Sequence, residues 1–307
     1  SACIGMNRPP YGSVPLLFVW SASELDKRHV IQLLSAVIYN AHIPGFLNGR
    51  IFQGESKAAC VPGLNCYSCP GAIGACPLGA FQSVLSGTAL RIPFYVLGTV
   101  LLFGILAGRF ICGWLCPFGL IQEALYRLPG PKLRHVPGTG ILRYFRYGIA
   151  VVFVLILPVA AYLISGIGEP AFCKYICPAG TLEASVPLLL MNQSLAAAAG
   201  WITVWKFFVL AFFLVLMICI YRPFCRFVCP LGVWYGLWNR RAMLGIAVAE
   251  KRCTHCGTCH AVCPAEAVIA GNAECISCGR CVEGCPEKAI YFRNPLCDPE
   301  QLEVKRK

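Results

Sequence analysis

Two runs of cysteines near the C-terminus share the spacing Cys-x2-Cys-x2-Cys-x3-Cys-Pro and begin at Cys253 and Cys275. In paired runs of this kind, each run gives three thiolates to one [4Fe-4S] cubane and its fourth thiolate to the other cubane. The spacing lets the backbone wrap around a cube while its N–H groups point at anionic sulfur. The predicted ligands are Cys253, Cys256, Cys259 and Cys285 for the first cluster, and Cys275, Cys278, Cys281 and Cys263 for the second.

Two other metal chemistries match parts of these runs. Structural zinc also uses paired cysteines, and residues 256–260 match the Cys-x-x-Cys-His string that attaches c-type haem. The cubane spacing already requires both cysteines of the haem string. We therefore expect two [4Fe-4S] clusters here, with zinc and haem as the alternatives.

A further cysteine motif lies earlier in the chain. The tetrapeptide Cys-Pro-x-Gly occurs four times, and three of the copies have another cysteine four positions before them. Four soft thiolates favour an iron–sulfur cluster or zinc, and the ferredoxin-type runs nearby favour a [4Fe-4S] cluster. The predicted ligands of this third, inner cluster are Cys112, Cys116, Cys225 and Cys229.

The remaining motif cysteines predict a fourth, outer cluster, but they offer more ligands than a cubane needs. We choose Cys69, Cys76, Cys173 and Cys177, with Cys66 as the alternate. Cys60 and the spare cysteine are candidates for a disulfide or for a further cofactor. Four [4Fe-4S] clusters would use 16 of the 21 cysteines in this way.

The composition indicates where these sites are held. The chain is 57% hydrophobic and 13% charged, with a mean hydropathy of +0.65 and a formal net charge of +12. An ordinary soluble domain is about a quarter charged, so a purely water-soluble globule is excluded. The basic residues lie beside apolar segments rather than on a basic, aromatic-rich face, which argues against nucleic-acid binding. The sequence therefore predicts a membrane protein that holds metal.

Four apolar segments are candidates to cross a hydrocarbon core about 30 Å thick: residues 30–47, 92–108, 147–167 and 207–221. Ten basic residues flank the two candidate inner loops, including Arg109, which can snorkel to the membrane surface, against five on the other side. The excess of positive charge places the loop after the second span and the C-terminal region in the cytoplasm. The Cys-Pro-x-Gly motifs then alternate between the outer and the inner face, as two parallel repeats would arrange them.

The fold class that we expect is an α-helical membrane protein with about four transmembrane helices in two parallel repeats, followed by a 2[4Fe-4S] ferredoxin-like α+β domain. The predicted boundaries are an N-terminal segment at 1–29, a transmembrane domain at 30–249, the ferredoxin domain at 250–296 and a charged tail at 297–307.

Two acidic residues and two histidines offer further chemistry. Glu123 and Glu183 each follow a Cys-Pro turn by a few residues, so each is either an acid in the first turn of a helix or a group that exchanges protons with a quinone. His29 and His42 lie near the first candidate span, and we interpret them as interfacial residues rather than haem ligands. No catalytic residue is predicted.

Three stretches carry a resemblance to a known family. Residues 110–119 read Phe-Ile-Cys-Gly-Trp-Leu-Cys-Pro-Phe-Gly, residues 223–232 read Pro-Phe-Cys-Arg-Phe-Val-Cys-Pro-Leu-Gly, and the double ferredoxin run follows. In these motifs the chain resembles the polyferredoxin-like 4Fe-4S membrane proteins, over roughly residues 28–292. That family includes the membrane ferredoxin subunit of periplasmic nitrate reductase systems and the iron–sulfur half of the membrane flavoprotein that serves nitrous oxide reductase. The chain departs from it in the cysteine cluster at 65–79 and the motif at 173–177, and we expect no N-terminal flavin-binding domain.

The resemblance implies electron transfer between a quinol pool or a cytoplasmic donor and extracytoplasmic redox partners. We expect an electron-transfer subunit of an oxidoreductase complex in a bacterial or archaeal cytoplasmic membrane, rather than a stand-alone enzyme. Its expected partners are membrane lipid, a cytoplasmic electron donor and other redox subunits, such as a flavin-bearing or cytochrome protein on the outer face, with quinone as a further candidate. The alternatives are a quinol dehydrogenase subunit of a respiratory complex and a metal-reductase or maturation factor.

Overall fold

The computed structural model describes residues 27–87, 92–133, 138–267 and 269–293. Most of this part of the chain is helical. In chain order its elements are α1 (Lys27–Tyr39), α2 (Ile43–Asn48), η1 (Glu55–Ala58), α3 (Pro77–Leu85), α4 (Phe94–Ala107), α5 (Phe110–Trp114), α6 (Pro117–Tyr126), α7 (Thr139–Ile149), η2 (Ala150–Ile156), α8 (Leu157–Ser165), α9 (Ala171–Tyr175), α10 (Pro178–Gly180), η3 (Thr181–Ser185), α11 (Val186–Met191), α12 (Gln193–Ala197), α13 (Trp201–Cys219), α14 (Pro223–Phe227), α15 (Pro230–Trp238), β1 (Gly245–Val248), η4 (Glu250–Arg252), α16 (Thr258–Ala261), α17 (Arg280–Glu283) and β2 (Ile290–Arg293).

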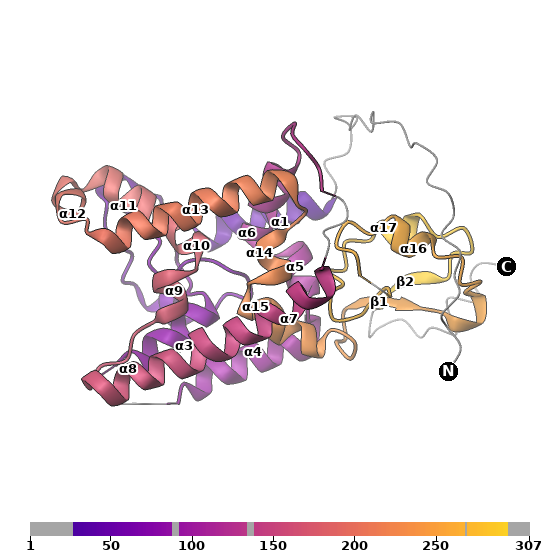
Figure 1. Cartoon of the computed structure of the whole chain (residues 1–307), viewed down its shortest axis with the longest axis horizontal. Coiled ribbons are helices and arrows are strands. Elements are labelled where there is room, and N and C mark those ends of the chain that lie inside the picture. The colour runs from indigo at the N-terminus through magenta and orange to yellow at the C-terminus, as the bar shows by residue number, and fades with distance from the viewer. Residues whose placement is uncertain (1–26, 88–91, 134–137, 268, 294–307) are drawn as a thin grey trace.

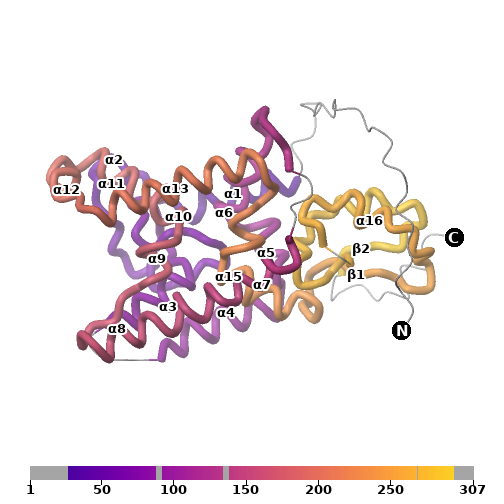
Figure 2. The backbone as a smooth tube through the Cα atoms, in the orientation of Figure 1, coloured from indigo at the N-terminus to yellow at the C-terminus, as the bar shows by residue number. Residues whose placement is uncertain are grey.

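The longest helices run along the long axis of the molecule, and a smaller unit with the only described sheet lies at one end (Figure 1). The short helices α9, α14 and α5 lie between the long ones. The trace in Figure 2 shows the same arrangement, with α11 and α12 at the end opposite to the sheet. This layout positions the cysteine motifs inside the helical domain rather than on its surface.

Two helices are long and apolar enough to cross a membrane: the continuous helix Thr139–Ser165 and the helix Trp201–Cys219. Phe94–Ala107 is a shorter apolar helix. The first candidate span is not continuous, because α1 ends at Tyr39 and α2 begins at Ile43. The prediction of apolar membrane-type helices is therefore confirmed for two segments, and the four-span layout stays a prediction.

Both π-helical segments precede a proline. The segment η2 runs into Pro158, and η3 runs toward Pro187. Proline cannot donate to the carbonyl four residues earlier and its ring crowds that carbonyl, so the hydrogen bonds re-form over five residues. The N–H of Leu157 accordingly donates to Val152, and the N–H of Val186 donates to Thr181.

Each Cys-x3-Cys-Pro motif has one local structure. The first cysteine lies in a five-residue helix, and the proline after the second cysteine begins the next helix, where a missing N–H costs nothing. The N–H of the second cysteine donates to the carbonyl five residues earlier at 2.9–3.0 Å in all three copies. The residues that accept this bond, Ile111, Phe172 and Phe224, are at most 1% exposed. The sequence repeat is therefore also a backbone repeat.

The smaller unit is itself a repeat around two antiparallel strands. Strand β1 pairs with β2, with Ile246 opposite Phe292. Residues with positive φ occur at matched positions in the two cysteine runs, for example His255 with Ser277 and Gly257 with Gly279. The unit begins with β1 at residue 245, a few residues before the predicted boundary at 250. Residues 1–26 of the predicted N-terminal segment 1–29 and the whole predicted tail 297–307 lie outside the described residues.

Candidate metal centres

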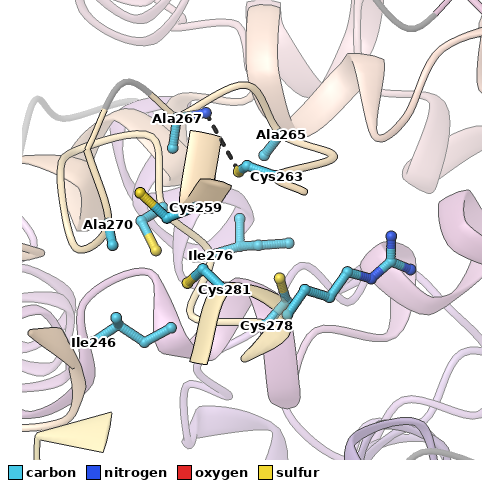
Figure 3. A pocket seen from close by; sticks show the side chains of 11 residues that line it. Ile246, Cys259, Cys263, Ala265, Ala267, Ala270, Ile276, Cys278 and Cys281 are labelled. Atoms are coloured by element: carbon cyan, nitrogen blue, oxygen red, sulfur yellow. Dashed lines mark hydrogen bonds between the residues drawn. The ribbon is translucent and has the colours of Figure 1, made fainter. Parts of the chain in front are cut away.

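The four cysteines predicted to hold the second ferredoxin cluster line one pocket (Figure 3). Its walls include the apolar side chains of Ile246 and Ile276. The N–H of Ala267 donates to Sγ of Cys263 at 3.4 Å, and N–H groups aimed at sulfur stabilise the charge of a cluster. The structure thus brings together Cys263, Cys275, Cys278 and Cys281.

The cysteines predicted for the first ferredoxin cluster lie nearer to solvent. Cys256 is exposed, and Cys253, Cys259 and Cys285 are partly exposed. Cys259 also lines the pocket of the second site, so the two sites adjoin. The N–H of Ala289 donates to Sγ of Cys285 at 3.4 Å, which repeats the Ala267–Cys263 bond of the other run.

The predicted ligands of the inner cluster surround a second, apolar cavity. Its walls are formed by side chains of both sequence repeats and by the loop that contains Leu64. Two donors reach the sulfur atoms: the N–H of Leu64 lies 3.4 Å from Sγ of Cys116, and Nε2 of Gln122 lies 2.9 Å from Sγ of Cys225. The cysteines on this cavity are Cys112, Cys116, Cys225 and Cys229.

Buried charge provides a test of whether an anionic cluster fits here. Within the part of the chain that the structure describes, the buried charged side chains other than histidine are five arginines and three glutamates: Arg28, Arg109, Arg146, Arg222, Arg226, Glu123, Glu266 and Glu274. The interior therefore holds two more positive than negative charges, which is costly without a counter-charge. An oxidised [4Fe-4S] core on four thiolates carries two negative charges, so the donor set and its surroundings fit such a cluster.

Two of these arginines hold the sequence repeats together. Arg109 lies three residues before Cys112 and donates through Nη2 to the carbonyl of Cys225, at 3.4 Å. Arg222 lies three residues before Cys225 and donates through Nη1 to the carbonyl of Cys112, at 2.5 Å. The last residue of each inner Cys-Pro-x-Gly motif makes room for the arginine of the other repeat. A Cβ atom at Gly119 would lie 3.2 Å from Arg222, and one at Gly232 would lie 3.0 Å from Arg109.

The arrangement of the outer cysteines bears on the choice between Cys69 and its alternate, Cys66. Cys66 interacts electrostatically with Cys177 and Cys76, and Cys173 interacts with Cys76 and Cys66. The thiol of Cys69, the first choice from sequence, instead donates to Oδ1 of Asn40 at 3.4 Å. The structure therefore groups the alternate, Cys66, with the other three cysteines.

The sixth residue after each Cys-Pro cysteine contacts a segment that belongs to the opposite repeat. Nε2 of Gln122 donates to Cys225, and Oε1 of Gln82 accepts from the N–H of Cys173 at 3.1 Å. In the second repeat, Oε2 of Glu183 accepts from the N–H of Cys66 at 2.6 Å, and the hydroxyl of Tyr235 donates to the carbonyl of Pro62 at 2.9 Å. This role of Gln82, Gln122 and Tyr235 was not predicted from the sequence, although the three residues share one offset from the cysteines.

The two acidic residues singled out from the sequence have opposite environments. Glu123 lies in the second turn of α6, not in the first, and is paired with Arg28 and Arg222 at 2.6 and 2.8 Å. Burial alone would raise the pKa of Glu123, but the charge of Arg222 and the hydrogen bonds from His29 and Arg28 hold it well below its usual range. Burial raises the pKa of Glu183 to about 7, against the smaller effect of its bond from Cys66. Of the two, only Glu183 has a pKa suited to proton exchange near neutral pH.

The histidines do not act as a pair. His29 is buried, with Nε2 2.7 Å from Oε2 of Glu123. His42 caps α2 by accepting from the N–H of Gly45 at 3.1 Å. His29 is therefore part of a buried charge network rather than an interfacial residue. Among the described residues, no three His, Cys, Asp or Glu side chains converge closely enough to hold a single metal ion.

Comparison with known proteins bears on which cofactor these cysteines hold. A family model described as a 4Fe-4S binding domain matches residues 88–135, 148–186 and 201–246. The chain is 28% identical over 199 residues to the ferredoxin-type protein NapH of Escherichia coli K12, covering 63% of this chain and 61% of that protein. It is 27% identical over 197 residues to the methylamine utilization ferredoxin-type protein MauN of Methylorubrum extorquens, covering 64% and 58%. The chain is therefore similar to ferredoxin-type 4Fe-4S proteins.

This similarity confirms the predicted resemblance and the prediction of [4Fe-4S] cofactors. Together with the two apolar helices, it also supports the prediction of a membrane protein. The chain spans between 52% and 62% of the length of the curated relatives that it matches. No solved structure matches it.

Proposed function

We propose that this protein transfers electrons across a membrane through four [4Fe-4S] clusters, between a cytoplasmic donor and an extracytoplasmic redox partner. The observation that carries the proposal is the order of the four cysteine sites: each adjoins the next, from the exposed end of the ferredoxin unit to the interior of the helical domain. A [4Fe-4S] cluster takes up and releases one electron at a time. The residues of the chain set the spacing, the surroundings and the exposure of each site.

The ligands that we assign follow the contacts described above. The first ferredoxin site is held by Cys253, Cys256, Cys259 and Cys285, the second by Cys263, Cys275, Cys278 and Cys281, the inner site by Cys112, Cys116, Cys225 and Cys229, and the outer site by Cys66, Cys76, Cys173 and Cys177. Cys256 is exposed, whereas Cys275 and Cys281 are buried. The first ferredoxin site is therefore the entry point for electrons from a soluble donor.

The second ferredoxin site lies directly against the inner motif. A Cβ atom at Gly113 would lie 2.1 Å from the carbonyl oxygen of Ile276, so only glycine permits this approach. Nε1 of Trp114 donates to the carbonyl of Ser277 at 2.9 Å. Both contacts join the segment between Cys112 and Cys116 of the inner site to the segment between Cys275 and Cys278 of the second ferredoxin site.

The inner and outer sites also adjoin, so no single electron step has to cross the whole hydrocarbon core. Tyr235 interacts electrostatically with three inner cysteines and with Cys76 of the outer site. The rings of Phe172 and Phe224, each next to the first cysteine of its motif, lie 6.3 Å apart between centroids. The outer cysteines therefore lie in the interior rather than at the far membrane face, and electrons leave toward that face from the outer site.

Glu183 supports a second candidate, a quinol dehydrogenase subunit. Its carboxyl group touches the outer site and has a pKa near neutrality. Oxidation of a quinol releases protons together with electrons, so a group of this kind would be needed beside the electron acceptor. A quinone analogue that inhibits electron transfer, with loss of this sensitivity in Glu183→Gln, would support this candidate.

Vesicles test the transmembrane proposal. The purified full-length protein is reconstituted with dithionite outside and an electron acceptor trapped inside, and acceptor reduction is followed optically. We expect reduction with the native protein and none with a Cys112→Ala/Cys229→Ala variant that keeps its ferredoxin clusters. Equal rates with the two proteins, or none with either, would refute the proposal.

A further inference from the structure

One short segment contacts both cysteine sites of the helical domain. This segment, residues 62–66, leads from Pro62 to Cys66 and is here termed the strap. Pro62, Gly63 and Leu64 line the cavity of the inner site, whereas Cys66 belongs to the outer group. The strap comes from the first sequence repeat, but residues of the second repeat hold both of its ends.

The anchors of the strap are Tyr235 and Glu183, which occupy equivalent positions after Cys229 and Cys177. The hydroxyl of Tyr235 donates to the carbonyl of Pro62 at 2.9 Å, and Glu183 accepts from the N–H of Cys66 at 2.6 Å. The strap is therefore fixed at the inner site by one anchor and at the outer site by the other. Such fixation at both ends keeps the distance between the two sites constant.

Two consecutive amide groups of the strap point at sulfur atoms of different sites. The N–H of Leu64 donates to Sγ of Cys116 at the inner site, 3.4 Å away. The backbone amide of Asn65 interacts with the thiol of Cys76 at the outer site. Because neighbouring residues are about 3.8 Å apart, these two sulfur atoms lie within roughly 12 Å of each other.

The side chain of Asn65 lies next to that of Asn40, which also accepts from the thiol of Cys69. Asn65 is fully buried, and its Oδ1 accepts from Nδ2 of Asn40 at 2.9 Å. Its own Nδ2 has no hydrogen-bond partner among the described residues. A buried N–H group without a partner is costly, and it is a donor available to an anionic cluster.

We propose that the strap couples the inner and outer clusters into one electronic pair, with the adjacent amides of Leu64 and Asn65 as the shared contact. This inference rests on the proposed function only in requiring clusters at both sites. Clusters held by the inner and outer cysteines would exchange a single electron, with no bond or proton changing place. The strap positions the two sites and takes no part in binding a substrate.

Magnetic coupling between reduced clusters tests the proposal without any transport assay. The full-length protein is reduced completely, and the EPR signal of the outer cluster is compared with that in Cys112→Ala/Cys229→Ala, which lacks the inner ligands. We expect splitting or fast relaxation of the outer signal in the native protein and their loss in the variant, with the ferredoxin signals kept. An outer signal that is identical in both proteins would overturn the proposal. Coupling without transport in vesicles would leave it intact and refute only the proposed function.

A charge placed in the strap gives an independent test that needs no ligand to be removed. Asn65→Asp adds a carboxylate to the strap, and we expect the midpoint potentials of both clusters to fall at pH 9. Gln122→Glu is the matched control, because Gln122 contacts a cysteine of the inner site only, so its effect should be confined to the inner cluster. A shift of one potential alone in Asn65→Asp, or of neither, would contradict a shared strap.

Discussion

Arg109 and Arg222 occupy equivalent positions in the two repeats, and each donates to the backbone carbonyl of the first inner cysteine in the other repeat. Each is also paired with a buried carboxylate: Arg109 lies 3.6 Å from Glu274 of the ferredoxin unit, and Arg222 lies 2.8 Å from Glu123 of α6. The two halves of the chain therefore hold the inner site through matching contacts, in which an arginine of each half donates to a backbone carbonyl of the other half.

Removing one of these arginines should weaken both the fold and the inner site. In Arg222→Gln, Glu123 loses a charge partner and the carbonyl of Cys112 loses a donor. Because removing one member of a buried ion pair is strongly destabilising, we expect a loss of about 3 kcal/mol in the free energy of unfolding. Denaturant unfolding in detergent would measure it. Arg222→Lys keeps the charge but cannot make both contacts, so its loss should be intermediate; a lysine variant as unstable as the glutamine one would argue against a role for the charge.

The stability of the native protein should fall at acidic pH through Glu123. Its pKa is depressed in the folded state below its ordinary value of 4.5, so its contribution is present above that value and is lost as the pH falls through the folded-state pKa. Thermal unfolding between pH 7 and pH 3 would show this. Glu123→Gln should be less stable at pH 7 and should lose less stability on acidification, and parallel pH profiles for the two proteins would disprove the assignment.

Iron content distinguishes the two candidate ligands of the outer site. Cys66→Ala should remove one cluster, about four iron atoms per chain if the ligand set is correct, because Cys66 lies among the other outer cysteines. Cys69→Ala should retain all of the iron, because its thiol is bonded to Asn40. Iron and sulfide analysis of the two purified variants, which differ from the native chain by one thiol each, decides the point. The opposite pattern would restore Cys69 as the ligand.

Trp114 should control electron entry into the helical domain. Its indole N–H bonds to Ser277, and its ring contacts that of Phe292 edge-on at 6.1 Å. In Trp114→Ala we expect reduction of the inner cluster by a donor to the ferredoxin unit to slow several-fold, since the ferredoxin unit loses both contacts. Stopped-flow spectroscopy would follow it. Trp114→Phe keeps an aromatic ring but loses the N–H donor, so its reduction rate should lie between those of the native protein and Trp114→Ala. Unchanged rates in both variants would exclude a role of Trp114 in electron entry.

The ferredoxin cysteines were predictable because their spacing is a local property of the chain. Each run has residues in the left-handed conformation at matched positions, and five of the predicted ligands line one pocket. The outer ligands were not predictable to the same degree. Cys66 and Cys69 are three residues apart, and the choice between them depends on where Cys173 and Cys177 lie in the folded chain.

Several arginines that the sequence places at the membrane surface are buried in the structure, for a physical reason. Arg109, Arg146, Arg222 and Arg226 contribute to the excess of basic residues that orients the chain, yet all four are buried. Arg109 does not snorkel to a membrane surface, because its guanidinium bonds to Gly232 and Cys225 in the interior. A sequence does not distinguish a cation that faces lipid headgroups from one that neutralises a buried site, so the inside-outside orientation stays a prediction.

The surplus of buried arginine has a consequence for how the protein matures in the cell. Before iron is delivered, protonated thiols leave the described interior with two more positive than negative charges, and the newly made chain is held together less firmly than the finished one. Metal loading is then a step of folding and not an addition to a completed scaffold. In iron-starved cells, quality-control proteases should accordingly remove the newly synthesised polypeptide rather than let an empty form accumulate.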